Sequence, residues 1–292
     1  MNSKMFKADA HPYLVPFDGG FEVAHAPIVP EKRISESEDW KTKLNEEKEM
    51  LGHWQHKLYA DDRYAVLLVF QAMDAGGKDS TIRHVLRGVN PTGVRVTSFK
   101  RPSTTELNHD FLWRSVLKLP ERGEIGVFNR SYYEEVLVVR VHPHILNSQR
   151  LPQPISENIW ADRYRSVVEH ERHLAKQGTV ILKFWLNISK EEQRQRFLKR
   201  IEQPNKRWKF SAADLDEREH WDDYMAAYES CLNATSRPWA PWYAIPADDK
   251  PFTRWQVATL INSAFEQIDV NFPTLGAEAM AELLETKKRL NQ

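Results

Sequence analysis

Five apolar runs along the chain predict the strands of a sheet. They lie at residues 64–70, 94–99, 124–128 and 179–186, with a weaker run at 242–245. Continuous runs that lack polar alternation are typical of parallel strands covered on both faces. The run at 64–70 (YAVLLVF) is the clearest and predicts a central strand.

Helical periodicity fills the intervals between these runs. In the segment 35–58, one face is formed by Trp40, Leu44, either Met50 or Leu51, Trp54 and Leu58, and a serine cap is expected at its start. Further helices are expected at 79–87, 104–117, 161–177, 189–202, 211–233 and 252–268. Strands that alternate with helices predict a doubly wound, three-layer α/β/α fold with a parallel central sheet.

Composition and charge narrow the class of protein. The 292 residues are 41% hydrophobic. Because 41 Lys and Arg balance 41 Asp and Glu, the sequence excludes a uniformly basic surface that would bind nucleic acid or a membrane. No apolar run approaches the roughly 20 residues that span a bilayer, and the N-terminus lacks an apolar signal core. The single cysteine, Cys231, lies in a helical pattern and is expected to be a buried bystander. We expect a cytoplasmic globular protein, whose first 35 residues form an irregular arm over the main body.

A phosphate-binding loop is the sharpest motif. The segment 70–81 (FQAMDAGGKDST) joins the first strand to a helix, where glycine amides and the helix N-terminus can face phosphate oxygens. Lys78 adds a mobile cation. The general Walker pattern fails twice, because Ala72 replaces its first glycine and Asp79 follows the lysine. Asp74 is placed to hold the metal instead, and the alternative is a glycine-rich turn with a solvated lysine.

Polar residues after two other strands point to the same edge of the sheet. Asn129 stands where a neighbouring strand would carry the Walker B carboxylate, and Glu134 is placed to supply that carboxylate one turn later. Arg130 either contacts a phosphate or forms a surface ion pair. Because ligands of open α/β sheets bind outside the carboxyl ends of strands, Lys78, Arg101 and Arg130 are expected to converge on a polyanion.

One segment has a strong charge bias. Residues 194–209 (RQRFLKRIEQPNKRWK) contain seven Lys or Arg and one Glu, and the sign reverses in residues 214–223. Taken alone, the run predicts a solvated helical face that pairs with its acidic neighbour. The alternative is a lid that brings cations to a bound phosphate.

These stretches together resemble polyphosphate kinases of the second family, and most closely the subgroup called class III. The similar segments, in chain order, are QAMDAGGKDSTIRHV, SFKRPS, GEIGVFNRSYYEEVLVVRVHP, RQRFLKRIEQPNKRWKFS, DLDEREHWDDYMAAYESCLNATS and APWYAIPADDK. The resemblance implies a P-loop kinase fold with a helical lid at about 190–225. It also implies phosphoryl transfer between inorganic polyphosphate and nucleoside mono- or diphosphates, from AMP to ADP to ATP, with Mg²⁺ or Mn²⁺.

The resemblance also assigns roles to individual residues. The catalytic set it implies is Asp74, Lys78, Asn129, Arg130 and Glu134, with Asp74 and Glu134 as metal ligands. The phosphate- or nucleotide-binding set it implies is Ala75, Gly76, Gly77, Asp79, Ser80, Thr81, Arg101, Arg200, Lys206, Arg207 and Lys209. The expected partners are polyphosphate and adenine or guanine nucleotides, with no nucleic acid and no membrane.

Two other functions stay open from the sequence. An ATP-dependent nucleoside monophosphate kinase would share the fold and the lid, although it would need fewer cations. A non-catalytic sensor of nucleotide or polyanion would not need both Asp74 and Glu134 beside a phosphate.

Several structural expectations complete the picture. The predicted division is an arm and helix (1–60), a catalytic domain (61–275) and a tail (276–292). Homo-oligomers are expected, with the stripe around Trp40 and Trp54 either forming an interface or packing on its own sheet. His142 and His144 are expected to be loop or core residues rather than a metal pair, and the aromatic segment 239–243 to pack in the core.

Overall fold

A five-stranded parallel sheet forms the centre of the molecule. The computed structural model describes residues 5–31, 39–209 and 213–291. The strands are β1 (Ala65–Gln71), β2 (Val94–Ser98), β3 (Ile125–Asn129), β4 (Thr179–Asn187) and β5 (Trp242–Pro246). Their spatial order is β2-β3-β1-β4-β5, and every neighbouring pair is parallel. All five predicted strands are therefore confirmed within one or two residues.

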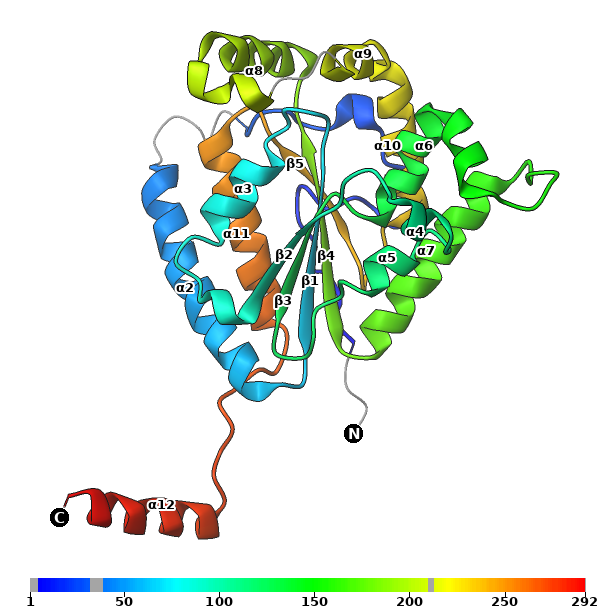
Figure 1. The fold of residues 1–292 in the computed structure, drawn as a ribbon. Helices are drawn as coiled ribbons and strands as arrows, with labels where there is room; N and C mark the ends of the chain where they lie inside the picture. Colours follow the sequence, from blue (N-terminus) through cyan, green and yellow to red (C-terminus); the bar gives the residue numbers. More distant parts are fainter. Residues whose placement is uncertain (1–4, 32–38, 210–212, 292) are drawn as a thin grey trace.

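Helices cover both faces of this sheet, as the three-layer prediction requires (Figure 1). One layer contains α3 (Lys78–Val85) and α11 (Lys250–Glu266), with α2 (Trp40–Asp61) packed outside α11. The other layer contains α7 (Ile159–Lys176) and α10 (Trp221–Thr235), with the short α6 (Val138–Val141) beside α10. Short 3-10 helices complete this part of the chain at η1 (Val23–His25), η2 (Pro91–Gly93), η3 (Tyr132–Val136) and η4 (Pro143–Gln149).

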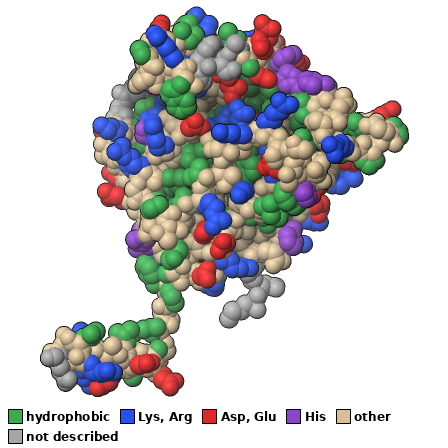
Figure 2. Space-filling model, in the orientation of Figure 1, with side chains coloured by type: hydrophobic (Ala, Val, Ile, Leu, Met, Phe, Trp, Pro, Cys, Tyr) green, Lys and Arg blue, Asp and Glu red, His purple; other side chains and the backbone are tan. Residues whose placement is uncertain are grey.

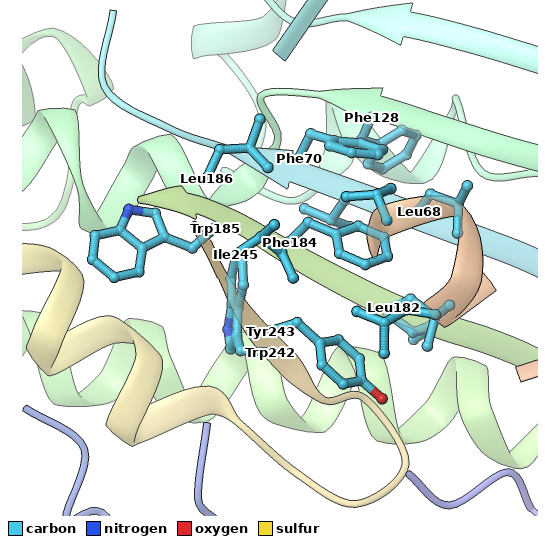
Figure 3. Close-up of a cluster of buried hydrophobic side chains, with 14 of the residues drawn as sticks. Leu68, Phe70, Phe128, Leu182, Phe184, Trp185, Leu186, Trp242, Tyr243 and Ile245 are labelled. Carbon is cyan, nitrogen blue, oxygen red and sulfur yellow. The ribbon is translucent and has the colours of Figure 1, made fainter. Parts of the chain in front are cut away.

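The core consists of strand side chains enclosed between the two helical layers. Phe70 and Phe184 meet on adjacent strands with ring centroids 5.1 Å apart, and Figure 3 shows them beside Leu68, Leu182 and Ile245. All seven residues of β1 are buried, which explains its uninterrupted apolar pattern. This packing fixes the carboxyl end of β1, where the phosphate-binding loop begins.

The aromatic stripe of α2 packs on the chain itself. Trp40 meets Phe252 and Trp255 at 5.2 and 4.7 Å between ring centroids, and Trp54 stacks on Phe265 at 6.0 Å. These contacts lie on α11 and show that the stripe is internal packing rather than an open interface. Asp39 caps the helix, whereas the serine expected to cap it lies outside the described residues.

The N-terminal arm covers one edge of the sheet, as expected. The Val15 amide donates to the Trp242 carbonyl at 2.9 Å, and the Ala244 amide donates to the Tyr13 carbonyl at 2.8 Å. An antiparallel bridge between Leu14 and Tyr243 accompanies these bonds. The arm thus satisfies backbone groups that β5 would otherwise expose.

Two predicted helices are each divided in the structure. The segment 104–117 forms α4 (Thr104–Leu107) and α5 (Trp113–Val116), because the Asp110 carboxylate accepts from the Leu112 amide at 2.9 Å and starts a new turn. The described part of 211–233 forms α9 (Ala213–Glu219) and all but the last two residues of α10, with His220 between them. The prediction of one continuous helix was wrong in both segments.

Two helical segments lie outside the layers. α8 (Lys190–Glu202), η5 (Pro204–Lys209) and α9 lie over the carboxyl end of the sheet, at the top of Figure 1. α12 (Ala277–Leu290) projects away from the body at the opposite end. Within the described residues, no helix combines the length and the apolar character that crossing a membrane requires.

Candidate active site

A tight loop joins β1 to α3 and presents backbone amides at the carboxyl edge of the sheet. A Cβ on Gly76 would lie 2.6 Å from Ala72 Cβ and 2.8 Å from the Met73 carbonyl oxygen, so only glycine fits there. Gly77 has φ +103°, a conformation that other residues rarely adopt. The two glycines therefore produce the turn, and an alanine at position 72 is compatible with it.

Lys78 is the first residue of α3 and folds back onto this loop. Its Nζ donates to the Ala72 carbonyl at 2.6 Å, and only 8% of the residue is exposed. Burial, reinforced by the nearby positive charge of Arg130, lowers the pKa of Lys78 from 10.5 to about 8. The alternative of a solvated lysine is excluded, because the ammonium group is held inside the loop.

Arg130 lies between the two predicted metal ligands. Its guanidinium donates to Asp74 Oδ1 at 2.8 Å, and its Nη1 lies 3.8 Å from Glu134 Oε2. These carboxylates, Glu134 first, raise the pKa of Arg130 above its ordinary value. Arg130 has φ +62°, and its amide donates to the Phe70 carbonyl at 3.1 Å. A left-handed backbone at a non-glycine residue beside charged groups is a feature of functional sites.

Asn129, at the end of β3, connects two other parts of the site. Its amide nitrogen donates to Asp79 Oδ1 at 2.7 Å and to Ser98 Oγ at 3.4 Å. An aspartate in the place of Asn129 would face the Asp79 carboxylate and repel it. The two departures from the Walker patterns, at positions 79 and 129, are therefore complementary.

A cavity of about 860 Å³ opens beside the loop. The charged side chains around it are eleven cations, Lys78, Arg83, Lys100, Arg101, Arg130, Arg196, Lys199, Arg200, Lys206, Lys250 and Arg254, and three aspartates, Asp74, Asp79 and Asp214. Figure 2 shows Lys and Arg side chains gathered around this upper part of the surface. The structure brings Lys78, Arg101 and Arg130 together in this one wall, while their contact with a polyanion stays a prediction.

Most of the predicted site residues lie in the wall of this cavity. Besides the charged residues named above, these are Ala75, Gly76, Gly77, Ser80 and Asn129. Glu134 instead lines a neighbouring cavity of about 110 Å³, whose wall also includes Asp74 and Arg130.

Two predicted phosphate ligands whose side chains are described, Thr81 and Arg207, do not line either cavity. Thr81 is buried beneath the loop, with 3% of its surface exposed. Arg207 is exposed, and its Nε donates to the Ile201 carbonyl at 2.9 Å. The side chain of Lys209 lies outside the described part of the chain, so its contact with substrate stays a prediction.

Several cations of the cavity were missed from the sequence. Arg83 lies on α3, Lys250 and Arg254 on the first turns of α11, and Lys100 directly after β2. Arg254 donates to Ser80 Oγ at 2.8 Å. Lys78, Arg101 and Arg130 were predicted because ligands of open α/β sheets bind outside the carboxyl ends of strands. The same rule applies to α11, because this helix follows the carboxyl end of β5.

Two side chains in the first two turns of α8 donate hydrogen bonds to the phosphate-binding loop. Gln193 Nε2 donates to the Asp74 carbonyl at 2.9 Å, and Arg196 Nη1 donates to the Ala75 carbonyl at 3.1 Å. Arg200 pairs with Asp214 at 3.5 Å, so part of the basic run does contact its acidic neighbour. The run nevertheless directs Arg196, Lys199, Arg200 and Lys206 to the cavity wall.

The residues expected to be bystanders have structural partners. His142 Nε2 lies 2.9 Å from Glu217 Oε2, and within the described ranges no group of three His, Cys, Asp or Glu side chains is arranged to hold a metal. Cys231 is buried, which raises its pKa to about 12 and disfavours the reactive thiolate. Trp242 and Tyr243 are core residues, as expected.

A glycine loop, a buried lysine and a cation-rich cavity at the carboxyl edge of a parallel sheet define a P-loop phosphotransferase. The sequence matches the family described as Polyphosphate kinase 2 (PPK2) over residues 34–273. The chain belongs to this family.

Curated relatives and a solved structure show how similar the chain is to other members. It is 55% identical to the ADP-polyphosphate phosphotransferase of Rhodopseudomonas palustris over 249 residues, which cover 85% of this chain and 86% of that protein. It is 49% identical to the AMP/ADP-polyphosphate phosphotransferase of Meiothermus ruber over 219 residues, 75% of this chain and 78% of the other. The crystal structure of polyphosphate kinase 2 from Arthrobacter aurescens superposes with a TM-score of 0.81 at 36% identity, covering 91% of this chain and 93% of that one.

Proposed function

We propose that this enzyme transfers phosphoryl groups between inorganic polyphosphate and nucleoside mono- and diphosphates, converting AMP to ADP and ADP to ATP. Its relatives at 55% and 49% identity are named as phosphotransferases of polyphosphate with ADP and with AMP or ADP. The observation that carries the proposal is the cavity wall, in which eleven cations face three aspartates.

The cations of the cavity repel one another until a polyanion enters. Burial and the charge of Arg196 lower the pKa of Lys250 to about 8, and burial together with Arg83 and Arg196 lowers the pKa of Arg254. The Nε of Arg254 is buried without a hydrogen-bond partner among the described residues. A polyphosphate chain, with a negative charge on every phosphate, relieves this repulsion along the whole cavity. This surplus of cations favours a polymeric donor over a single triphosphate.

Asp74 and Arg130 mark the proposed point of transfer. Both line the large basic cavity and the smaller cavity that contains Glu134, Tyr224 and Tyr228. We place the donor phosphates in the basic cavity and the phosphate of the accepting nucleotide where the two cavities meet. Arg130 and Lys78 then stabilise charge on the transferred group, which is the main task of a protein in phosphoryl transfer.

Kinases of this kind generally need a divalent metal ion. Asp74 and Glu134, which both contact Arg130, supply carboxylate oxygens, the ligands that Mg²⁺ and Mn²⁺ prefer. Two carboxylates with phosphate oxygens are an ordinary Mg²⁺ set. We propose that these two residues hold the metal, which would neutralise charge on the phosphates.

We assign α8, η5 and α9 the role of a lid. The bonds from Gln193 and Arg196 to the carbonyls of Asp74 and Ala75 join the base of α8 to the phosphate-binding loop. Closure of such a segment over a bound polyanion excludes water, which protects the phosphoryl group from hydrolysis.

The donor distinguishes this proposal from its rivals. With AMP, long-chain polyphosphate and Mg²⁺ but no ATP, the enzyme should form ADP, and a Lys78→Ala variant serves as the control. An ATP-dependent monophosphate kinase would form ADP only after ATP is added. A sensor would bind polyphosphate and form no ADP under either condition.

Other expectations from the sequence stay predictions. These are the class III subgroup, the use of guanine nucleotides, assembly into homo-oligomers, a cytoplasmic location and the boundaries of the catalytic domain at 61 and 275. The family match ends at residue 273, close to the expected end of the catalytic domain at 275, but it begins at residue 34, inside the segment 1–60 that the prediction kept outside this domain.

A further inference from the structure

A buried ion pair lies behind the loop that carries Arg130 and Glu134. Lys183, in the middle of β4, contacts Glu171 of α7 with 2.6 Å between Nζ and Oε2, and both side chains are fully buried. Neither residue lines the two cavities of the site. A charge pair in a sheet core carries a desolvation penalty that apolar side chains would avoid, so its presence requires a reason.

Two consecutive tyrosines connect this pair to the active-site loop. The hydroxyls of Tyr132 and Tyr133 both donate to Glu171 Oε1, at 2.9 and 2.8 Å. Lys183 Nζ donates to the Tyr133 hydroxyl and to the Thr235 carbonyl, each at 2.8 Å.

The tyrosines lie between the two charged residues of the site. Arg130, with its left-handed φ of +62°, precedes them by two residues, and Glu134 follows directly. Ser131 Oγ accepts from the Tyr133 amide at 3.1 Å and starts the 3-10 turn that contains Glu134. A strained backbone persists only where its surroundings hold it in place, and here the two hydroxyl bonds hold it.

We propose that Lys183 and Glu171 are positioning residues, which fix Tyr132 and Tyr133 and thereby set Arg130 and Glu134 for phosphoryl transfer. The proposal rests on the catalytic roles given above to Arg130 and Glu134. A carboxylate paired with an ammonium group accepts strong, directional bonds from two hydroxyls, which an apolar core could not provide. The pair thus gives the loop one defined geometry.

Tyr133→Phe tests the proposal, because it removes the bond that the Tyr133 hydroxyl donates to Glu171 and the bond that it accepts from Lys183, while it keeps the ring. We expect kcat for ATP formation to fall about tenfold, because small displacements of catalytic groups cost that much or more. The KM for polyphosphate should stay within about twofold, since the basic cavity is unchanged. Tyr164→Phe is the matched control: its hydroxyl accepts from Arg140 at 2.6 Å, away from Glu134, and its kcat should change less than twofold.

A double-mutant cycle with Glu134→Gln separates positioning from stability. In the Glu134→Gln background, Tyr133→Phe should lower kcat by about threefold or less, while its effect on Tm stays the same. Equal losses of kcat in both backgrounds, or no loss in the single variant, would overturn the positioning role. If Tyr133→Phe loses its cooperative unfolding transition, Tyr132→Phe, which removes one donor, takes its place in the cycle.

The cycle also distinguishes failure of this proposal from failure of the proposed site. If Glu134→Gln lowers kcat and Tyr133→Phe does not, the role of the buried pair is refuted and the site stands. If Glu134→Gln leaves kcat unchanged, the role of Glu134 is refuted, and the positioning proposal falls with it.

Discussion

Raising the pH from 7 to 9 should neutralise Lys78 and weaken the productive use of polyphosphate. Burial, together with the charge of Arg130, lowers the pKa of Lys78 from 10.5 to about 8. A lysine with a lowered pKa is cationic below that value and loses its charge as the pH rises through it. A polyanion binds the cationic form better, so polyphosphate capture should decline in this range.

The size of the decline follows from the pKa. With a pKa of about 8, roughly nine-tenths of Lys78 is charged at pH 7 and roughly one-tenth at pH 9. Hence kcat/KM for polyphosphate should fall about tenfold, whereas an ordinary exposed lysine would lose only a few per cent of its charge. Bound polyphosphate raises the pKa of Lys78, so kcat at saturation should fall only at higher pH.

The assay is kcat/KM for long-chain polyphosphate between pH 7 and 9.5, with ADP and Mg²⁺ held constant. Lys78→Arg keeps its charge throughout and should show lower activity with a much smaller decline, because Lys250 still loses its charge in this range. Lys250→Met is the decisive control, because the pKa of Lys250 is also lowered to about 8, and this variant should retain the decline. A wild-type kcat/KM that stays constant between pH 7 and 9.5 would contradict the role given to Lys78. A decline that disappears in Lys250→Met but persists in Lys78→Arg would contradict it as well.

Three further changes test other parts of the site. Asp74→Asn should lower kcat by about 10²-fold and change the nucleotide KM little in steady-state assays, because it removes charge that acts in the transition state. Neutralising Lys199 and Lys206 to Gln should raise the KM for polyphosphate and flatten its dependence on salt, whereas Arg194→Gln, which breaks an exposed pair with Glu191, should do neither. Gly76→Ala should abolish turnover by distorting the loop, measured beside a circular dichroism check of folding, because its Cβ would meet Ala72 at 2.6 Å. Unchanged kinetics in the variants of Asp74, of Lys199 and Lys206, or of Gly76 would contradict the role given to those residues, whereas the Arg194→Gln control should behave as wild type.

The sheet could be predicted because each strand has a local signature. Four of the strands, β1, β3, β4 and β5, are buried along almost their whole length, so continuous apolar runs mark them in the sequence. The partly exposed β2 (VRVTS) is marked by its β-branched residues instead. The division at Asp110 could not be predicted, because the periodicity of 104–117 is compatible with one continuous helix. The helix is divided by a single hydrogen bond, which the Asp110 carboxylate accepts from the Leu112 amide. Likewise, the stripe on α2 showed which face is apolar but not that α11 covers it.

The site was predicted where sequence order places residues directly at strand ends. Lys78 and Arg130 follow their strands closely, and both reach the cavity. Arg83 and Arg254 lie further along their helices, and only the helix geometry directs them to the same space. The Lys183–Glu171 pair left no signal, because an isolated lysine in an apolar run does not reveal its partner.

The central claim is that the basic cavity presents polyphosphate for direct transfer to a nucleotide. The most direct measurement is ATP formation from ADP and long-chain polyphosphate, with Mg²⁺ and no other phosphoryl donor, in wild type and in folded Lys78→Ala. We expect sustained ATP formation by wild type and a loss of about 10²-fold or more in the variant. Tight polyphosphate binding by wild type without ATP formation, or equal rates in the two proteins, would contradict it.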